Sequence, residues 1–197
     1  MPITHTNRKN VTYTLYRCTT KTGKLRHYFA RQSAKGTPCQ AIPDGYEVSE
    51  TPNGRVSIVK SRPKRVRQSE ADMIQRILDN EHPSPSKYRI FVRHNCIDIY
   101  ERVDSGADNL IDMFRQRGLG FAVDRREFRE WCDSRARFEA VMRFTLLDEE
   151  TRMYQAQQMY YLGSIKDWIN VGEVDGLEVL ARDMIGRLGT ESFSELY

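Results

Sequence analysis

Apolar and polar residues alternate along residues 11–18 (VTYTLYRC). A period of two is typical of a β-strand with one buried face. Residues 25–32 follow a Gly-containing turn and are interpreted as the returning strand, so the two segments predict a β-hairpin. A second hairpin is predicted for 45–50 and 55–60, because Asn53–Gly54 lies between them and Asn-Gly is a strong hairpin-turn signal.

The pattern then changes to the spacing of amphipathic helices. Four segments have apolar residues three and four positions apart, namely 69–82, 108–118, 124–134 and about 174–188. The first helix is expected to begin at a Ser69 capping box and the third at an Asp124 capping box. In the third helix, Phe128, Trp131 and Cys132 lie on one stripe, which predicts that these side chains are buried.

Alternation returns between and after these helices. Residues 87–101 predict a hairpin that turns near His94–Asn95. Residues 137–163 predict two long strands joined at Asp148–Thr151. A helix is the rival interpretation of 152–162, because Met, Gln and Ala favour helices. A short helical turn is expected at 164–169.

These elements predict an α+β protein, since hairpins and helices come in runs and do not alternate strictly. The expected architecture is an antiparallel, hairpin-rich N-terminal module followed by a mixed α+β domain of order α–ββ–α–α–ββ–α. The predicted divisions are a flexible arm at 1–10, a basic β-rich module at 11–62, a basic linker at 63–68 and an α+β domain at 69–197.

Composition points to a cytoplasmic protein that does not enter a membrane. The longest uncharged apolar runs are a few residues, far below the roughly 20 residues of a membrane span. The N-terminus has no apolar stretch typical of a secretory signal. The four cysteines are 21, 57 and 36 residues apart, which matches neither a zinc framework nor a dense disulfide pattern.

The charge is distributed unevenly along the chain. Residues 1–67 contain 14 Lys or Arg and three acids, a net charge of +11, whereas residues 68–197 have a net charge of −7. Six cations fall within the thirteen positions from Arg55 to Arg67, with no acid among them. A positive field over one region favours encounter with polyanions.

This asymmetry favours a non-enzymatic accessory protein that binds DNA or RNA. Guanidinium groups bind phosphate bidentately, and bases stack on aromatic side chains. The candidate stacking residues are Tyr28 and Phe29. The candidate phosphate contacts are Arg31, Lys35, Arg55, Lys60, Arg62, Lys64, Arg65 and Arg67.

The alternative function is a protein-interaction or adaptor domain that docks an acidic partner or associates with itself as a homo-oligomer. Residues 153–163 contain Met, Gln and Tyr without any charge, and Tyr and Met are enriched at protein interfaces. The candidate interface residues are Met153, Tyr154, Met159, Tyr160 and Tyr161. A central strand covered on both faces explains the same composition.

An enzyme is the third interpretation, and we expect neither a catalytic residue, a metal site nor a cofactor. The chain has no phosphate-binding glycine fingerprint and no nucleophile elbow. An enzymatic function would require His27, Cys39 or His94 to share a cleft.

Overall fold

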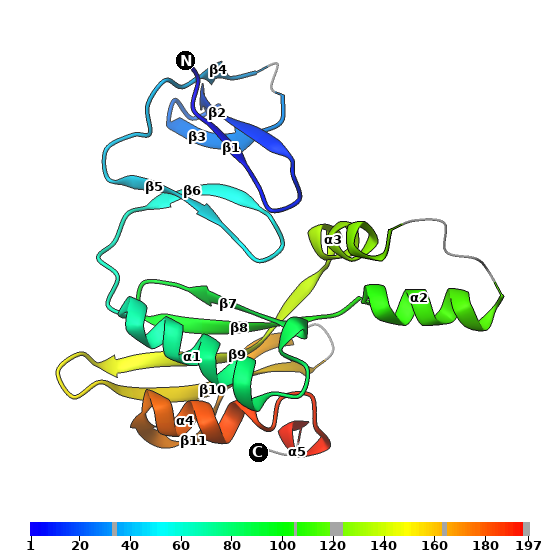
Figure 1. Cartoon of the computed structure of the whole chain (residues 1–197). Coiled ribbons are helices and arrows are strands. Elements are labelled where there is room, and N and C mark those ends of the chain that lie inside the picture. Colours follow the sequence, from blue (N-terminus) through cyan, green and yellow to red (C-terminus); the bar gives the residue numbers. More distant parts are fainter. Residues whose placement is uncertain (33–34, 105, 119–123, 163–164, 195–197) are drawn as a thin grey trace. The chain divides into compact units, whose positions relative to one another are not determined.

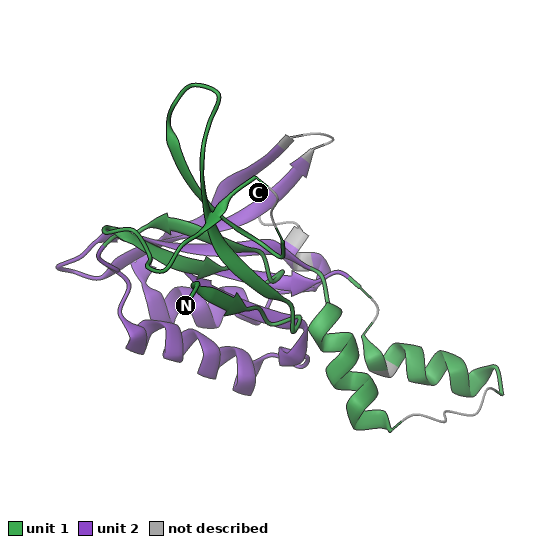
Figure 2. Cartoon of the chain, turned by 90° about the horizontal axis from the view of Figure 1, so that it is seen from above, with its two compact units in different colours: residues 1–62, 104–137 green, residues 63–103, 138–197 purple. Residues whose placement is uncertain are grey.

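The computed structural model describes residues 1–32, 35–104, 106–118, 124–162 and 165–194. Contacts divide the chain into two compact units, each built from two segments (Figure 2). Unit 1 comprises residues 1–62 and 104–137, and unit 2 comprises residues 63–103 and 138–197. Helices and antiparallel sheets are both present, so the predicted α+β class is confirmed, while the predicted element order is matched only roughly.

Unit 1 contains the two predicted hairpins (Figure 1). The first sheet is centred on β2, which pairs with β3 on one side and with β1 and β4 on the other. The second sheet is the hairpin of β5 and β6. Gly54 has a φ of +73°, the left-handed conformation that makes glycine suitable for this turn. The strands are β1 (Thr4–Thr6), β2 (Thr12–Thr19), β3 (Leu25–Ala30), β4 (Thr37–Pro38), β5 (Tyr46–Glu50) and β6 (Val56–Lys60).

Residues 1–10 differ from the predicted flexible arm. They include β1, which is antiparallel to β2. Side-chain contacts also join this segment to the second hairpin. Glu50 accepts hydrogen bonds from the His5 ring (2.6 Å) and from the Arg8 backbone N–H (2.7 Å), and Asn7 donates to the Gly54 carbonyl (2.5 Å). These partners are more than 40 residues away in sequence, so local composition could not reveal them.

Two helices, α2 (Ala107–Gln116) and α3 (Arg125–Arg135), also belong to unit 1, whereas residues 104–137 were expected in the C-terminal domain. Asp124 is confirmed as the N-cap of α3, since its side chain accepts the N–H groups of Arg126 and Glu127. Arg8 donates to the carbonyl oxygens of Asp133 (2.9 Å) and Ala136 at the end of α3.

The predicted burial of one α3 residue is wrong. Trp131 is 53% exposed, while Cys132 is buried. The Arg135 guanidinium lies 4.8 Å from the centre of the Trp131 ring, and Phe128 stacks beside it. An amphipathic stripe identifies a face of a helix but not how much of that face its neighbours cover.

Unit 2 is built on a five-stranded antiparallel sheet in the order β11-β10-β9-β8-β7 (Figure 1). The strands are β7 (Tyr88–Val92), β8 (Cys96–Arg102), β9 (Phe138–Asp148), β10 (Met153–Leu162) and β11 (Ile165–Gly176). The helices are α1 (Gln68–Glu81), the 3-10 turn η1 (Pro85–Lys87), α4 (Leu177–Ile185) and α5 (Glu191–Ser194). The strand interpretation of 152–162 is therefore confirmed.

The core of unit 2 lies between the sheet and the helices α1 and α4, which contact each other (Figure 1). Alternate strand residues such as Ile97, Phe144 and Ala156 are fully buried there, together with Ile74 of α1 and Ile185 of α4. Burying such side chains contributes about 1.5–3 kcal/mol each for the larger ones. One face of the sheet is thus apolar because it packs against helices.

The predicted helical turn at 164–169 is wrong. The described part of this segment lies in β11, and Lys166 to Ile169 pair with residues 158–161 of β10. A short segment with mixed propensity takes the conformation that its long-range neighbour supports.

None of the helices among the described residues has the length and apolar character that a membrane-spanning helix needs.

A buried ion pair determines where α1 begins. The helix starts at Gln68, and the Glu70 carboxylate accepts the Arg67 backbone N–H (2.7 Å), so Ser69 is not the cap. Arg152 binds the same carboxylate through Nε (2.9 Å) and Nη2. The Arg152 and Glu70 side chains are only 18% and 13% exposed. Burial alone would raise the pKa of Glu70, but these hydrogen bonds and the Arg152 charge lower it.

We predict that Glu70→Gln lowers the free energy of unfolding by about 1–3 kcal/mol at neutral pH. Because the folded-state pKa of Glu70 is lowered, its contribution is complete above the unfolded-state pKa of about 4.3 and is lost as the pH falls through the folded-state value. The difference between wild type and variant should therefore shrink on acidification, as measured by urea unfolding across a pH series.

Glu149→Gln is the matched control, since the Arg65–Glu149 pair is half exposed on both sides and should contribute less than about 1 kcal/mol. A difference for Glu70→Gln that does not change with pH would contradict the role given to the carboxylate charge.

Candidate functional site

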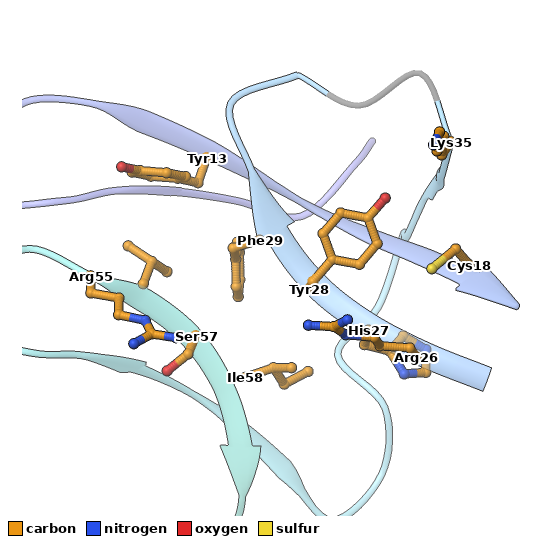
Figure 3. Close-up of a pocket in the computed structure, with 11 residues that line it drawn as sticks. Tyr13, Cys18, Arg26, His27, Tyr28, Phe29, Lys35, Arg55, Ser57 and Ile58 are labelled. Atoms are coloured by element: carbon orange, nitrogen blue, oxygen red, sulfur yellow. The ribbon is translucent and has the colours of Figure 1, made fainter. Parts of the chain in front are cut away.

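Unit 1 contains a groove of about 740 Å³ (Figure 3). β3 contributes four consecutive residues to it and β6 contributes three, with Arg55 directly before β6. The lining residues are Tyr13, Cys18, Arg26, His27, Tyr28, Phe29, Lys35, Arg55, Val56, Ser57 and Ile58.

The groove follows the outer edges of two strands. Within the described residues, β3 pairs only with β2 and β6 only with β5. Successive side chains of a strand point to opposite faces of its sheet. At an edge strand that has no neighbour, the side chains of both faces border the space next to that edge. This explains why consecutive residues of β3 and β6 reach the same groove.

One wall of the groove depends on a close approach to Gly36. A Cβ at this position would lie 2.5 Å from the Tyr28 hydroxyl and 2.9 Å from the Tyr16 Cβ. Tyr16 and Tyr28 stack with ring centres 6.0 Å apart. Glycine therefore lets the chain that carries Lys35 lie directly against this tyrosine pair.

The lining is basic and aromatic. Arg26, Lys35 and Arg55 are exposed cations, and His27 lies beside Arg26 on β3. The described residues that line the groove include no Asp or Glu. Tyr13, Tyr28 and Phe29 supply aromatic rings (Figure 3). This arrangement can attract an anion and stack a planar group at the same time.

The groove brings together four of the residues predicted to bind nucleic acid. Tyr28, Phe29, Lys35 and Arg55 line it. Three other candidates of unit 1 are exposed but are not part of the lining: Arg31, Lys60 and Arg62.

The remaining candidates belong to unit 2 and do not form a free linker. Val66 is buried in the core of that unit. The Arg65 N–H donates to the His94 carbonyl (2.7 Å), and the Arg65 side chain pairs with Glu149 (2.7 Å). Arg67 is the N-cap residue of α1, and Lys64 is exposed. Residues 63–68 are therefore fastened to unit 2, and Arg65 is engaged by a carboxylate.

The predicted protein-interaction residues lie on β10, between β9 and β11 in the sheet. Residues 153–158 include the pairs with β9, whereas Met159, Tyr160 and Tyr161 pair with β11 alone. Tyr154 has no exposed surface and belongs to the core, so it is removed from this set. Tyr161 is 43% exposed. Met153, Met159 and Tyr160 are partly exposed.

The residues considered for catalysis do not gather in the groove. His27 lines it, whereas Cys39 is buried and is not among the lining residues. His94 belongs to unit 2, where its ring bonds to the Pro63 carbonyl. Among the described residues, no group of three or more His, Cys, Asp or Glu side chains is placed to hold a metal ion.

Arg26 is the groove cation that sequence analysis missed, and Tyr13 is the aromatic residue that it left out of the site. Both lie in strands that were predicted correctly. The alternation within each strand was visible in the sequence, but the meeting of the β3 and β6 edges was not.

Comparisons of the chain with protein-family models, curated proteins and solved structures find no match.

We predict that Gly36→Ala destabilises unit 1, because a Cβ would overlap the Tyr16 and Tyr28 side chains. Overpacking of this kind costs about 1–3 kcal/mol. The expected result is a lower unfolding midpoint with reduced hydrogen-exchange protection in β2 and β3.

Gly186→Ala is the control for this prediction. Gly186 has a φ of −61°, and a Cβ added there would lie 3.6 Å from the Arg182 carbonyl oxygen, an ordinary van der Waals distance. That substitution should leave stability unchanged or raise it slightly. Equal unfolding midpoints for the two variants would show that the Tyr16 and Tyr28 side chains can make room for a Cβ at position 36.

Proposed function

We propose that unit 1 binds single-stranded nucleic acid in this groove, and that the protein is a non-enzymatic, cytoplasmic nucleic-acid-binding accessory protein. The observation that carries the proposal is the joint presence of Arg26, Lys35 and Arg55 with three aromatic rings in one groove. The charge of the unit supports it, since unit 1 contains 18 Lys or Arg and ten acids, a net charge of +8.

A single strand fits the groove better than a duplex does. The bases of a duplex are already stacked and turned away from solvent, so aromatic side chains on a sheet edge have nothing to stack on. A single strand offers unstacked bases and a flexible phosphate backbone together. The cations and rings of the groove match these two features.

An acidic extended peptide is the second candidate ligand. β3 and β6 are both edge strands within the described residues, and an edge strand can pair with an added strand through its main chain. Such a peptide would use the cations of the groove but would not require Tyr13, Tyr28 or Phe29. Substitution of an aromatic residue therefore separates the two ligands.

We predict that the purified protein binds short fluorescent single-stranded oligonucleotides more tightly than duplexes of the same sequence, with an affinity that falls as salt is raised. Changing Arg26, Lys35 and Arg55 together to Ser should reduce the slope of log affinity against log salt by about 2, because each phosphate contact on a single strand contributes about 0.7. Fluorescence anisotropy across a salt series measures this slope.

The matched control changes Lys60, Arg62 and Lys64 to Ser, which removes the same charge outside the groove. Its slope should change much less. Equal losses in the two triple variants would show a general charge effect without a defined groove, and no binding at low salt would refute the proposal.

We further predict that Tyr13→Ala weakens single-strand binding by about 1–3 kcal/mol, whereas Tyr13→Phe preserves it, because stacking needs the ring and not the hydroxyl. Competition with a polyglutamate peptide tests the second ligand in the same assay. If polyglutamate displaces the oligonucleotide and Tyr13→Ala binds polyglutamate and oligonucleotide as well as the wild type does, the groove is a site for acidic peptides.

A further inference from the structure

The five-stranded sheet of unit 2 has a second face, opposite to the one packed against α1 and α4 (Figure 1). Residues paired directly across neighbouring strands lie on the same face of a sheet. A row of such partners crosses all five strands. It consists of Phe91, Asp98, Arg143, Gln157 and Asn170. We call the surface that contains this row the sheet face.

The sheet face is basic although its unit is not. Unit 2 contains 13 Lys or Arg and 17 acids, a net charge of −4. Strand alternation nevertheless places Arg89, Arg143 and Lys166 on this one face. Arg93 joins them, because its guanidinium lies over the Phe91 ring at 5.5 Å. The acidic balance of the unit therefore hides a local cluster of four cations.

A buried carboxylate holds two of these cations in place. Asp98 has no exposed side-chain surface. It accepts hydrogen bonds from Arg143 Nε (2.6 Å) and Nη2 (3.1 Å), and it forms an ion pair with Arg93, whose Nε lies 2.7 Å from Oδ2. Burial alone would lower the pKa of both guanidinium groups. The charge of Asp98 and a hydrogen bond to Tyr100 raise the pKa of Arg93, and the hydrogen bonds and charge of Asp98 raise that of Arg143. Both arginines therefore remain charged.

This arrangement leaves hydrogen-bonding capacity on the sheet face. Within the described residues, Nη1 of Arg93 and Nη1 of Arg143 have no hydrogen-bond partner. The Arg93 side chain is 47% exposed and that of Arg143 20% exposed. One carboxylate cannot balance two guanidinium groups, so a net positive charge is presented with a fixed orientation. A fixed guanidinium pair loses little entropy when it binds phosphate.

Aromatic rings accompany these cations. The Arg143 guanidinium lies 4.2 Å from the centre of the Trp168 ring, and Lys166 Nζ lies 4.9 Å from that of Tyr161. Trp168 is partly exposed and Tyr161 is 43% exposed. Unpaired bases stack on aromatic rings and on guanidinium planes. An acidic protein partner would use the charges without needing this regular pairing of cations with rings.

We propose that the sheet face of unit 2 is a second binding site for a single strand of nucleic acid, with phosphates at Arg89, Arg93, Arg143 and Lys166 and a base stacked at Trp168. The ligand class is that of the proposed function, but the residues that carry this site all belong to unit 2. The site can therefore be tested separately from the groove of unit 1.

Tryptophan fluorescence gives a local test, because the chain has two tryptophans and Trp131 belongs to unit 1. The full-length Trp131→Phe variant retains Trp168 as its only tryptophan and is titrated with short oligouridylate and oligothymidylate. We expect saturable quenching of Trp168 that weakens as salt is raised. The reciprocal Trp168→Phe variant retains Trp131 and should show no saturable quenching.

Charge substitutions in the Trp131→Phe background complete the test without disturbing Asp98. Arg89→Gln combined with Lys166→Gln should reduce the salt slope of Trp168 quenching by about 1.4. Arg76→Gln combined with Arg187→Gln removes the same charge from positions outside the sheet and should leave the slope unchanged.

The outcomes separate the two proposals. Oligonucleotide binding by anisotropy without quenching of Trp168 overturns the sheet-face site and leaves the groove in place. Quenching that persists when Arg26, Lys35 and Arg55 are changed to Ser supports the sheet face, and unchanged total binding in that variant counts against the groove. Quenching of Trp168 by polyglutamate but not by oligonucleotide overturns the assignment to nucleic acid.

Discussion

The period of two along a β-strand governs most of this structure. In unit 2, every second residue of the sheet enters an apolar core against α1 and α4, as Ile97, Ile99 and Phe144 do. The intervening residues must point to the other face, and the sequence places cations, amides and aromatic rings there. The same packing that stabilises the sheet therefore creates a polar surface on its opposite side.

Charges that lose contact with water have to be paired, and two carboxylates in unit 2 follow this rule. Asp98 is fully buried and binds two arginines, and Glu70 is nearly buried and binds Arg152 and the Arg67 backbone. Removing a charge from such a pair is costly because the remaining charge has no solvent to replace its partner. Glu70 is therefore used to start a helix, whereas Asp98 orients two guanidinium groups whose outer nitrogens stay accessible.

The density of cations along the chain is a poor guide to which cations lie together in the structure. The run of cations from Arg55 to Arg67 is the densest in the sequence, yet Arg65 is paired with Glu149 and the chain around Val66 is packed into unit 2. The groove takes one cation of that run, Arg55, and combines it with Arg26 and Lys35 from earlier in the chain. The tertiary structure, and not the density of cations along the chain, decides which cations lie in the groove and which are paired with a carboxylate.

The sequence alone determined the α+β class, both hairpins of unit 1, the strands at 138–148 and 153–162 and the positions of the main helices, because these depend on periodicity and turn residues within short segments. It also supplied Tyr28, Phe29, Lys35 and Arg55 as candidates for the site. Only the tertiary structure decided that β11 is a strand, that Thr4–Thr6 pairs with β2, and that Arg26 and Tyr13 line the groove. These features depend on contacts between segments far apart in sequence, and a strand's alternation does not say which neighbour its edge or its face will meet.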